Sequence, residues 1–165
     1  MEQYNRVRGI AHELDVAKVT VRGVPDKPGI AAGIFESLAE RHIAVDTIVQ
    51  NASVEKLTDL TFTVHANDLS KAVDIVEQQA KEIGANEVVA DDSLGKVSIV
   101  GTGIHSAPGY AARMFRTLSD SGINIEMIST GEIRIACIIR RSDVDKAVRA
   151  LHKAFELEKA DASEL

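Results

Sequence analysis

The turn from Val24 to Ala32 brings together groups that could hold a free amino acid. It follows a strand-like run, and a helical pattern begins at Pro28, a residue type favoured at the first position of a helix. Gly29 allows the backbone to approach a ligand closely, and the unpaired N–H groups at the start of a helix can donate to a carboxylate. The carboxylate of Asp26 could accept from an ammonium group. An ordinary strand-to-helix turn with a capping Asp would look the same. The interpretation as a binding site is therefore supported only because the turn occurs a second time in the chain.

The whole pattern around this turn restarts about 80 residues further along the chain. The run Lys96 to Gly101 matches Lys18 to Gly23, and the second Pro-Gly turn, Pro108-Gly109, matches Pro28-Gly29. Asp143 to Val148 matches Asp68 to Val73 in the same way. A repeat of this length indicates a duplicated domain rather than the unit of a solenoid.

Each copy contains alternating apolar runs typical of strands and apolar stripes at helical spacing. The predicted strands are 7–12, 17–23, 44–50, 59–65, 87–90, 96–101, 122–128 and 132–138. The predicted helices begin at Pro28, Leu69, the second Pro-Gly turn and Val144, and the first two end near Arg41 and at Gly84. The order β-α-β-β-α-β predicts the α+β class: two ferredoxin-like βαββαβ units, each an antiparallel sheet with its helices on one face.

The second copy lacks a closing strand, because only an acidic segment, 158–165, follows its last helix. A spare strand pattern, Val7 to His12, lies at the other end of the chain. We therefore expect it to complete the second sheet, with the first copy inserted into the second. The predicted domains are 17–92 for the first unit and 5–16 plus 95–157 for the second.

Composition and motifs exclude several classes of function. A net charge of -6 and dispersed basic residues argue against binding to nucleic acid or an anionic membrane. The single cysteine, Cys137, lies in an apolar run and indicates a reducing compartment, and no apolar stretch is long enough to span a membrane, so we expect a soluble, cytoplasmic protein. No phosphate-binding glycine motif, metal-ligand spacing or catalytic arrangement is present, and we expect no cofactor, no metal and no catalysis.

This pattern resembles the ACT domain, a small-molecule-sensing module, over nearly the whole chain. The stretches AKVTVRGVPDKPGIAA, TIVQN, KVSIVGTGIHSAPGYAARMF, INIEMIST and EIRIACII are similar to the regulatory region of aspartokinase, in particular the type also made as a separate regulatory subunit. The N-terminal strand of that family belongs to the second ACT unit. The resemblance implies no kinase domain in this chain. Met1 and a short polar lead look like the independent subunit, and a piece cut from a longer protein would look the same.

The resemblance implies a threonine site shared between two protomers. One protomer would supply Asp26, Lys27, Pro28, Gly29, Ile30, Ala31 and Gln50; the opposing one would supply Asn124 and Ile125. Physically, the backbone of the turn could bind the α-carboxylate, and Gln50 offers both a donor and an acceptor. A surface-capping Asp26, a solvated Gln50 and a simple turn residue at Asn124 are the alternatives.

A pseudo-symmetric second site would pair the second turn with the start of a strand in the other chain. Its residues would be His105, Ser106, Pro108, Gly109 and Ala111, with Ala44, Val45 and Asp46 across the interface. Ser106-Ala107 replaces Asp26-Lys27 there, so the second site is left open between lysine and no ligand.

The leading hypothesis is a regulatory subunit that binds threonine, with lysine as an open second effector, and mediates feedback inhibition of aspartate kinase in amino-acid and lysine biosynthesis. We expect a homodimer that joins a catalytic aspartokinase subunit in the holoenzyme. A free-standing tandem-ACT amino-acid sensor acting on another partner is the alternative. A small ferredoxin-like enzyme is disfavoured because no acid–base pair is specified.

Overall fold

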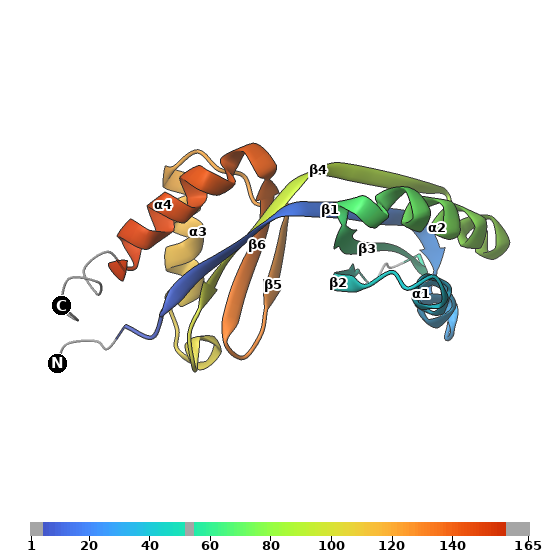
Figure 1. Ribbon diagram of the computed structural model, residues 1–165. Helices are drawn as coiled ribbons and strands as arrows, with labels where there is room; N and C mark the ends of the chain where they lie inside the picture. Colours follow the sequence, from blue (N-terminus) through green and yellow to red (C-terminus); the bar gives the residue numbers. More distant parts are fainter. Residues whose placement is uncertain (1–4, 52–54, 158–165) are drawn as a thin grey trace. The chain divides into compact units, whose positions relative to one another are not determined.

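A computed structural model describes residues 5–51 and 55–157 (Figure 1). Strands and helices alternate in two similar series along the chain. The strands are β1 (Gly9–Pro25), β2 (Val45–Gln50), β3 (Leu57–His65), β4 (Glu87–Val100), β5 (Met127–Thr130) and β6 (Arg134–Arg140). The α-helices are α1 (Ile30–Glu40), α2 (Leu69–Ile83), α3 (Tyr110–Asp120) and α4 (Val144–Ala154), with 3₁₀ turns at Ala66–Asp68, Ile104–Ser106 and Arg141–Asp143.

The chain divides into two compact units. The first unit is Asp15–Ser93, and the second unit combines the chain up to Leu14 with the chain from Leu94 onward. Strands β1 and β4 therefore each have one end in the first unit and the other end in the second. Two units of helices and antiparallel sheet are thus built from a chain that enters the second unit twice.

In the first unit the strands lie in the order β2-β3-β1-β4. Both β1 and β2 run antiparallel to β3, and Val19 and Ile48 both face Phe62 in that register. Helices α1 and α2 pack against each other, and the apolar side of the alternating strand pattern forms the core beneath them. Buried side chains of this core include Val19, Val21, Leu38, Phe62 and Val76.

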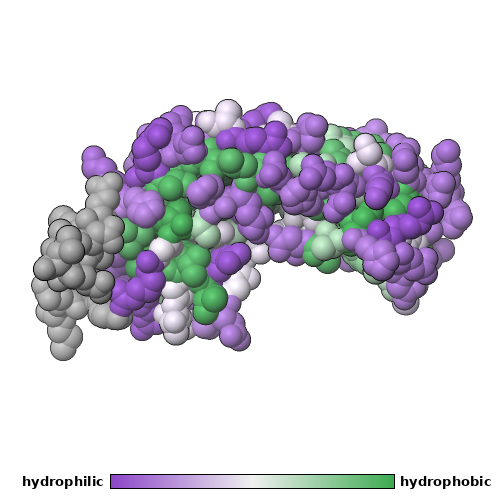
Figure 2. Space-filling model, viewed as in Figure 1, coloured by the Kyte–Doolittle hydropathy of each residue, from purple (hydrophilic) through white to green (hydrophobic). Residues whose placement is uncertain are grey.

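The second unit repeats this plan with the order β1-β4-β6-β5. Strand β6 runs antiparallel to both β4 and β5, and Val97 lies opposite Cys137. Helices α3 and α4 pack together, and hydrophilic side chains gather over the outer side of α4 in Figure 2. The fully buried side chains of this core include Val97, Ile99, Leu118, Cys137 and Phe155.

Equivalent backbone hydrogen bonds join the closing strand region to the first strand of each unit. The N–H of Asn86 donates to the carbonyl of Arg22 at 2.8 Å, and the N–H of Arg8 donates to the carbonyl of Val100 at 2.8 Å. The two donor residues lie 78 positions apart in the sequence, and the two acceptor residues also lie 78 positions apart. We infer that the segment from Arg8 takes in the second unit the place that the start of β4 takes in the first, with the first unit inserted between the two parts of the second.

The predicted pairs of short strands are wrong in their boundaries. The predicted strands 7–12 and 17–23 are one strand, β1, and the predicted strands 87–90 and 96–101 are one strand, β4. Neither 13–16 nor 91–94 contains Gly or Pro to end an extended run. Gly95 serves close packing instead, since a Cβ there would lie 2.5 Å from the Val144 side chain.

Candidate functional site

The first turn leaves the backbone of α1 open at its start. The N–H of Asp26 donates to the carbonyl of Lys56 at 2.9 Å, which fixes the turn against the start of β3. Gly29 has φ of 90°, and no side chain caps the helix. The prediction that the helix begins at Pro28 is wrong: Gly29 is left-handed, so helical geometry begins at Ile30. The structure gives the N–H groups of Ala31 and Ala32 no acceptor among the described residues.

The side chains of the first turn face solvent. Asp26, Lys27, Pro28 and Gly29 are exposed, while Ile30 and Ala31 are half-buried. Gln50 is exposed at the end of β2. Leu57, at the start of β3, pairs with Pro25, and Leu60 pairs with Gln50. The turn and Gln50 therefore lie at the same end of the first sheet, on either side of β3.

The remaining candidates of the threonine site lie in the second unit. Asn124 is exposed, and Ile125 is half-buried and packs against the core of its own unit. Both precede β5, which begins at Met127 rather than at Gly122 as predicted. The N–H of Glu126 donates to the carbonyl of Ile138 at 2.8 Å, so the segment reaches the sheet only at that point.

The second turn has the same backbone with different side chains. Gly109 has φ of 101° and precedes α3, again without a side-chain cap. His105 Nδ1 lies 2.7 Å from the carbonyl oxygen of Glu132, and Ser106 Oγ donates to the carbonyl of Gly103 at 3.0 Å. The side chains of His105 and Ser106 are thus engaged locally. Pro108 is exposed and Ala111 half-buried, while Ala44, Val45 and Asp46 belong to the first unit.

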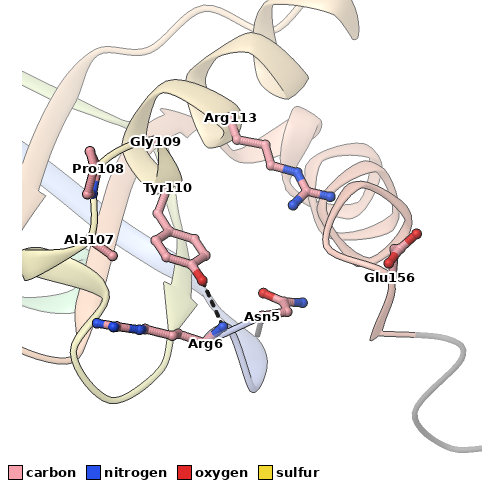
Figure 3. Close-up of a pocket in the computed structure, with 8 residues that line it drawn as sticks. All are labelled: Asn5, Arg6, Ala107, Pro108, Gly109, Tyr110, Arg113 and Glu156. Carbon is pink, nitrogen blue, oxygen red and sulfur yellow. Dashed lines mark hydrogen bonds between the residues drawn. The ribbon is translucent and has the colours of Figure 1, made fainter. Parts of the chain in front are cut away.

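A cavity of about 530 Å³ opens beside the second turn (Figure 3). Sequence reasoning found its Pro108 and Gly109 and missed the side chains that dominate it. The other lining residues are Asn5, Arg6, Ala107, Tyr110, Arg113 and Glu156. Alignment of the two copies could have pointed to Tyr110 and Arg113, because they replace Ile30 and Gly33 of the first helix.

A smaller cavity of about 350 Å³ lies in the first unit, beside Asn51 and Thr58. Its wall is stabilised by the N–H of Gly23, which donates to Asp59 Oδ1 at 3.1 Å, and by an ion pair of 2.8 Å between Arg22 and Glu87. The residues around it are Arg22, Gly23, Asn51, Leu57, Thr58, Asp59 and Asn86. None of the proposed effector contacts lines this cavity.

The described residues offer neither a reactive thiol nor a cluster of metal-ligating side chains. Burial raises the pKa of the Cys137 thiol to about 12, so this thiol is a poor nucleophile at neutral pH. Across residues 5–51 and 55–157 no three His, Cys, Asp or Glu side chains are grouped to hold a metal ion. No helix in the same ranges is long and apolar enough to cross a membrane.

Comparison with known proteins decides the family. The sequence model of the ACT domain matches two stretches, residues 19–79 and 97–155. A crystal structure of the regulatory subunit of aspartate kinase from Thermus thermophilus, in its ligand-free form, superposes with a TM-score of 0.86 at 43% identity, covering 91% of this chain and 99% of that one. The chain belongs to the ACT-domain family of aspartokinase regulatory subunits.

Two further relatives differ in how much of their own length this chain covers. A crystal structure of aspartokinase alpha and beta subunits matches with a TM-score of 0.84 at 45% identity and covers 91% of this chain and 99% of that one. Aspartate kinase from Pseudomonas fluorescens strain SBW25 is 51% identical over 152 residues, which are 92% of this chain and 37% of the relative. The chain thus spans little more than a third of that kinase, and the catalytic domain has no counterpart among its 165 residues.

Proposed function

We propose that this chain is the regulatory part of an aspartate kinase, which binds threonine and thereby mediates feedback inhibition of a catalytic partner. The observation that carries the proposal is the open first turn: exposed Asp26 precedes a helix in which the N–H groups of Ala31 and Ala32 have no acceptor among the described residues. Those donors suit an α-carboxylate, and Asp26 suits an ammonium or hydroxyl group. Similarity to the regulatory subunit of Thermus thermophilus aspartate kinase supports the same role.

The proposed pocket is completed by an opposing protomer. Asp26, Lys27, Pro28, Gly29, Ile30, Ala31 and Gln50 form its first half, and Asn124 and Ile125 of a second copy form the other. Two exposed isoleucines support self-association: Ile48 on β2 is 52% exposed and Ile128 on β5 is 45% exposed. Both strands are outermost in the sheets of their units, and an exposed apolar edge strand favours pairing with another chain.

The pseudo-symmetric site remains part of the proposal. Its residues are His105, Ser106, Pro108, Gly109 and Ala111, facing Val45 and Asp46 of the other copy. Ser106 provides no carboxylate where the first turn has Asp26, and its hydroxyl already donates to Gly103. A ligand there must therefore be recognised by other contacts, and the open choice is between lysine and no ligand.

Calorimetric titration with threonine and lysine, separately and together, tests the effector. Asp26→Asn removes the charge of the turn with little change of shape, and we expect at least a tenfold loss of threonine affinity, because hydrogen bonds to charged groups contribute about 1.5–3 kcal/mol. Asp145→Asn makes the same charge change at an exposed position of α4 and should leave binding unchanged. Equal losses in both variants, or no threonine binding at all, would contradict the proposal.

Co-purification tests the partner. A regulatory subunit should retain an aspartate kinase chain from a lysate of its own source, and threonine should lower the activity of the complex. Threonine binding without any associated kinase would instead support a free-standing tandem-ACT sensor that acts on another partner.

A further inference from the structure

The cavity beside the second turn is flanked by two guanidinium groups. It is enclosed by the start of α3, the end of α4 and residues 5 and 6, all within the second unit. In Figure 3, Arg6 extends beneath Ala107, and Arg113 reaches toward the end of α4, so the two cations lie on different sides of the space. A volume of about 530 Å³ lies within the range of small-molecule sites.

Among the described residues, the side chain of each of the two arginines donates a hydrogen bond to a backbone carbonyl. Arg6 Nη1 donates to the carbonyl of Gly103 at 2.9 Å, and Arg113 Nη2 donates to the carbonyl of Ala154. These acceptors are neutral, and within residues 5–51 and 55–157 neither arginine has an ion pair. Each guanidinium has five N–H donors. Glu156 is the carboxylate in the lining, so the arginines leave the cavity with an excess of positive charge.

The walls of the cavity are held in place by contacts between distant parts of the chain. The Tyr110 hydroxyl accepts from the N–H of Arg6 at 2.8 Å, and Asn5 Nδ2 donates to the carbonyl of Phe155 at 2.7 Å. The guanidinium of Arg113 lies 4.8 Å from the centre of the Phe155 ring, which also stacks with Tyr110. A cation fixed over an aromatic ring is pre-organised for a ligand.

The first unit has neither the tyrosine nor the arginine at the matching positions of its helix α1. Ile30 and Gly33 occupy the places of Tyr110 and Arg113 in the two eleven-residue helices α1 and α3. A Cβ added at Gly33 would meet only the Gln79 side chain, at 4.0 Å. The arginine and the tyrosine are thus features of the second unit that the shared backbone does not require.

We propose that this cavity binds a small molecule bearing a carboxylate or phosphate group, held by Arg113 and Arg6. Planar guanidinium groups recognise both kinds of oxyanion by paired hydrogen bonds. The cavity is formed within one unit of one chain, so the site does not depend on a second protomer. It shares no residue with the proposed threonine site, so either of these two proposals can fail without the other. It does share Pro108 and Gly109 with the pseudo-symmetric site, from which Arg6 and Arg113 distinguish it.

The test is titration of the full chain with succinate and, separately, with inorganic phosphate, at ionic strength held constant with chloride. NMR shifts of the backbone amides of Ala107 and of residues 109–113 report binding to the cavity. We expect saturation with at least one anion, and at least a tenfold weaker binding in Arg113→Met. Saturation by succinate alone identifies a carboxylate ligand, and saturation by phosphate alone identifies a phosphate ligand.

Arg116→Met is the matched control, because Arg116 lies on the same helix, is largely exposed and pairs with Asp120 at 3.9 Å. It should bind the anion like the wild type. Arg113→Met removes a contact with the Phe155 ring, and thermal melting would reveal any loss of stability that results. Arg6→Met leaves that contact in place and should also weaken binding. No saturable shift with either anion, or equal losses in Arg113→Met and Arg116→Met, would overturn the proposal.

Discussion

The two Pro-Gly turns share a backbone and differ in chemistry. Gly29 and Gly109 have φ of 90° and 101°, and each precedes a helix of eleven residues with no side-chain cap. The first turn presents an exposed carboxylate at Asp26, whereas the second has Ser106, whose hydroxyl is engaged within its own loop. The duplicated backbone therefore creates two places for a ligand, and the side chains decide what each can recognise.

A comparison of Gly101 with Gly9 gives the largest expected effect on stability. A Cβ at Gly101 would lie 1.9 Å from the carbonyl oxygen of Arg6, whereas one at Gly9 would meet nothing within 4 Å. Because backbone must move, Gly101→Ala should lower the free energy of unfolding by about 3 kcal/mol. Gly9→Ala, the control, should change it by less than about 0.5 kcal/mol. Urea denaturation measures both, and similar values would show that the backbone of Arg6 is not held against Gly101.

The cores of the two units should differ in alkaline solution. The single thiol, Cys137, is in the second core, and burial raises its pKa from 9.0 to about 12. Between these values the unfolded state ionises and the folded state does not, so stability is complete below pH 9 and falls as the pH rises toward 12. The loss should be about 2 kcal/mol at pH 10.5, at 1.36 kcal/mol per pH unit.

Hydrogen exchange at pH 8 and pH 10.5 on the wild type and Cys137→Ala locates this effect. After correction for the intrinsic exchange rate, the rise from pH 8 to pH 10.5 should reduce the protection of β6 more in the wild type than in the variant. In the wild type, β3 should lose less protection than β6. Rapid alkylation of the folded protein at pH 8 would contradict the burial of the thiol.

The two outer strands offer the third comparison. Ile48→Lys on β2 and Ile128→Lys on β5 place a charge where each strand could pair with another copy, and each should weaken self-association about tenfold. Val89→Lys, at a residue 42% exposed on β4, is a control at a third strand. An effect confined to Ile48 or to Ile128 would show that one edge alone forms the interface.

The fold could be predicted from sequence because both copies show the alternation of apolar residues typical of strands and the apolar spacing typical of helices. The stripe from Leu69 ends at Gly84, which has φ of 74° as expected of a helix cap. The continuity of β1 and β4 was missed, since short-range patterns predict where strands begin and say little about whether two adjacent strands are one. The ACT fold and the family are confirmed by the comparisons.

The sites could be predicted less well. A turn such as Asp26–Ala31 is visible in sequence because its residues are adjacent, and its role as an effector site stays a prediction. The cavity at Arg113 was missed because its walls come from segments about 100 residues apart, Arg6 and Tyr110. Such a juxtaposition depends on how the chain folds back, which a single sequence does not state.

Sedimentation equilibrium with and without threonine, on the wild type, Asp26→Ala, Gln50→Ala and Asn124→Ala, tests the central claim of a shared pocket most directly. A ligand that binds only the assembled pocket stabilises the dimer by about 2.7 kcal/mol at a hundredfold excess over its dissociation constant. Threonine should therefore tighten self-association of the wild type, have no effect on Asp26→Ala, and have a reduced effect on Gln50→Ala and Asn124→Ala. Threonine binding to a demonstrable monomer as tightly as to the dimer, or unchanged binding in Asn124→Ala, would contradict the account.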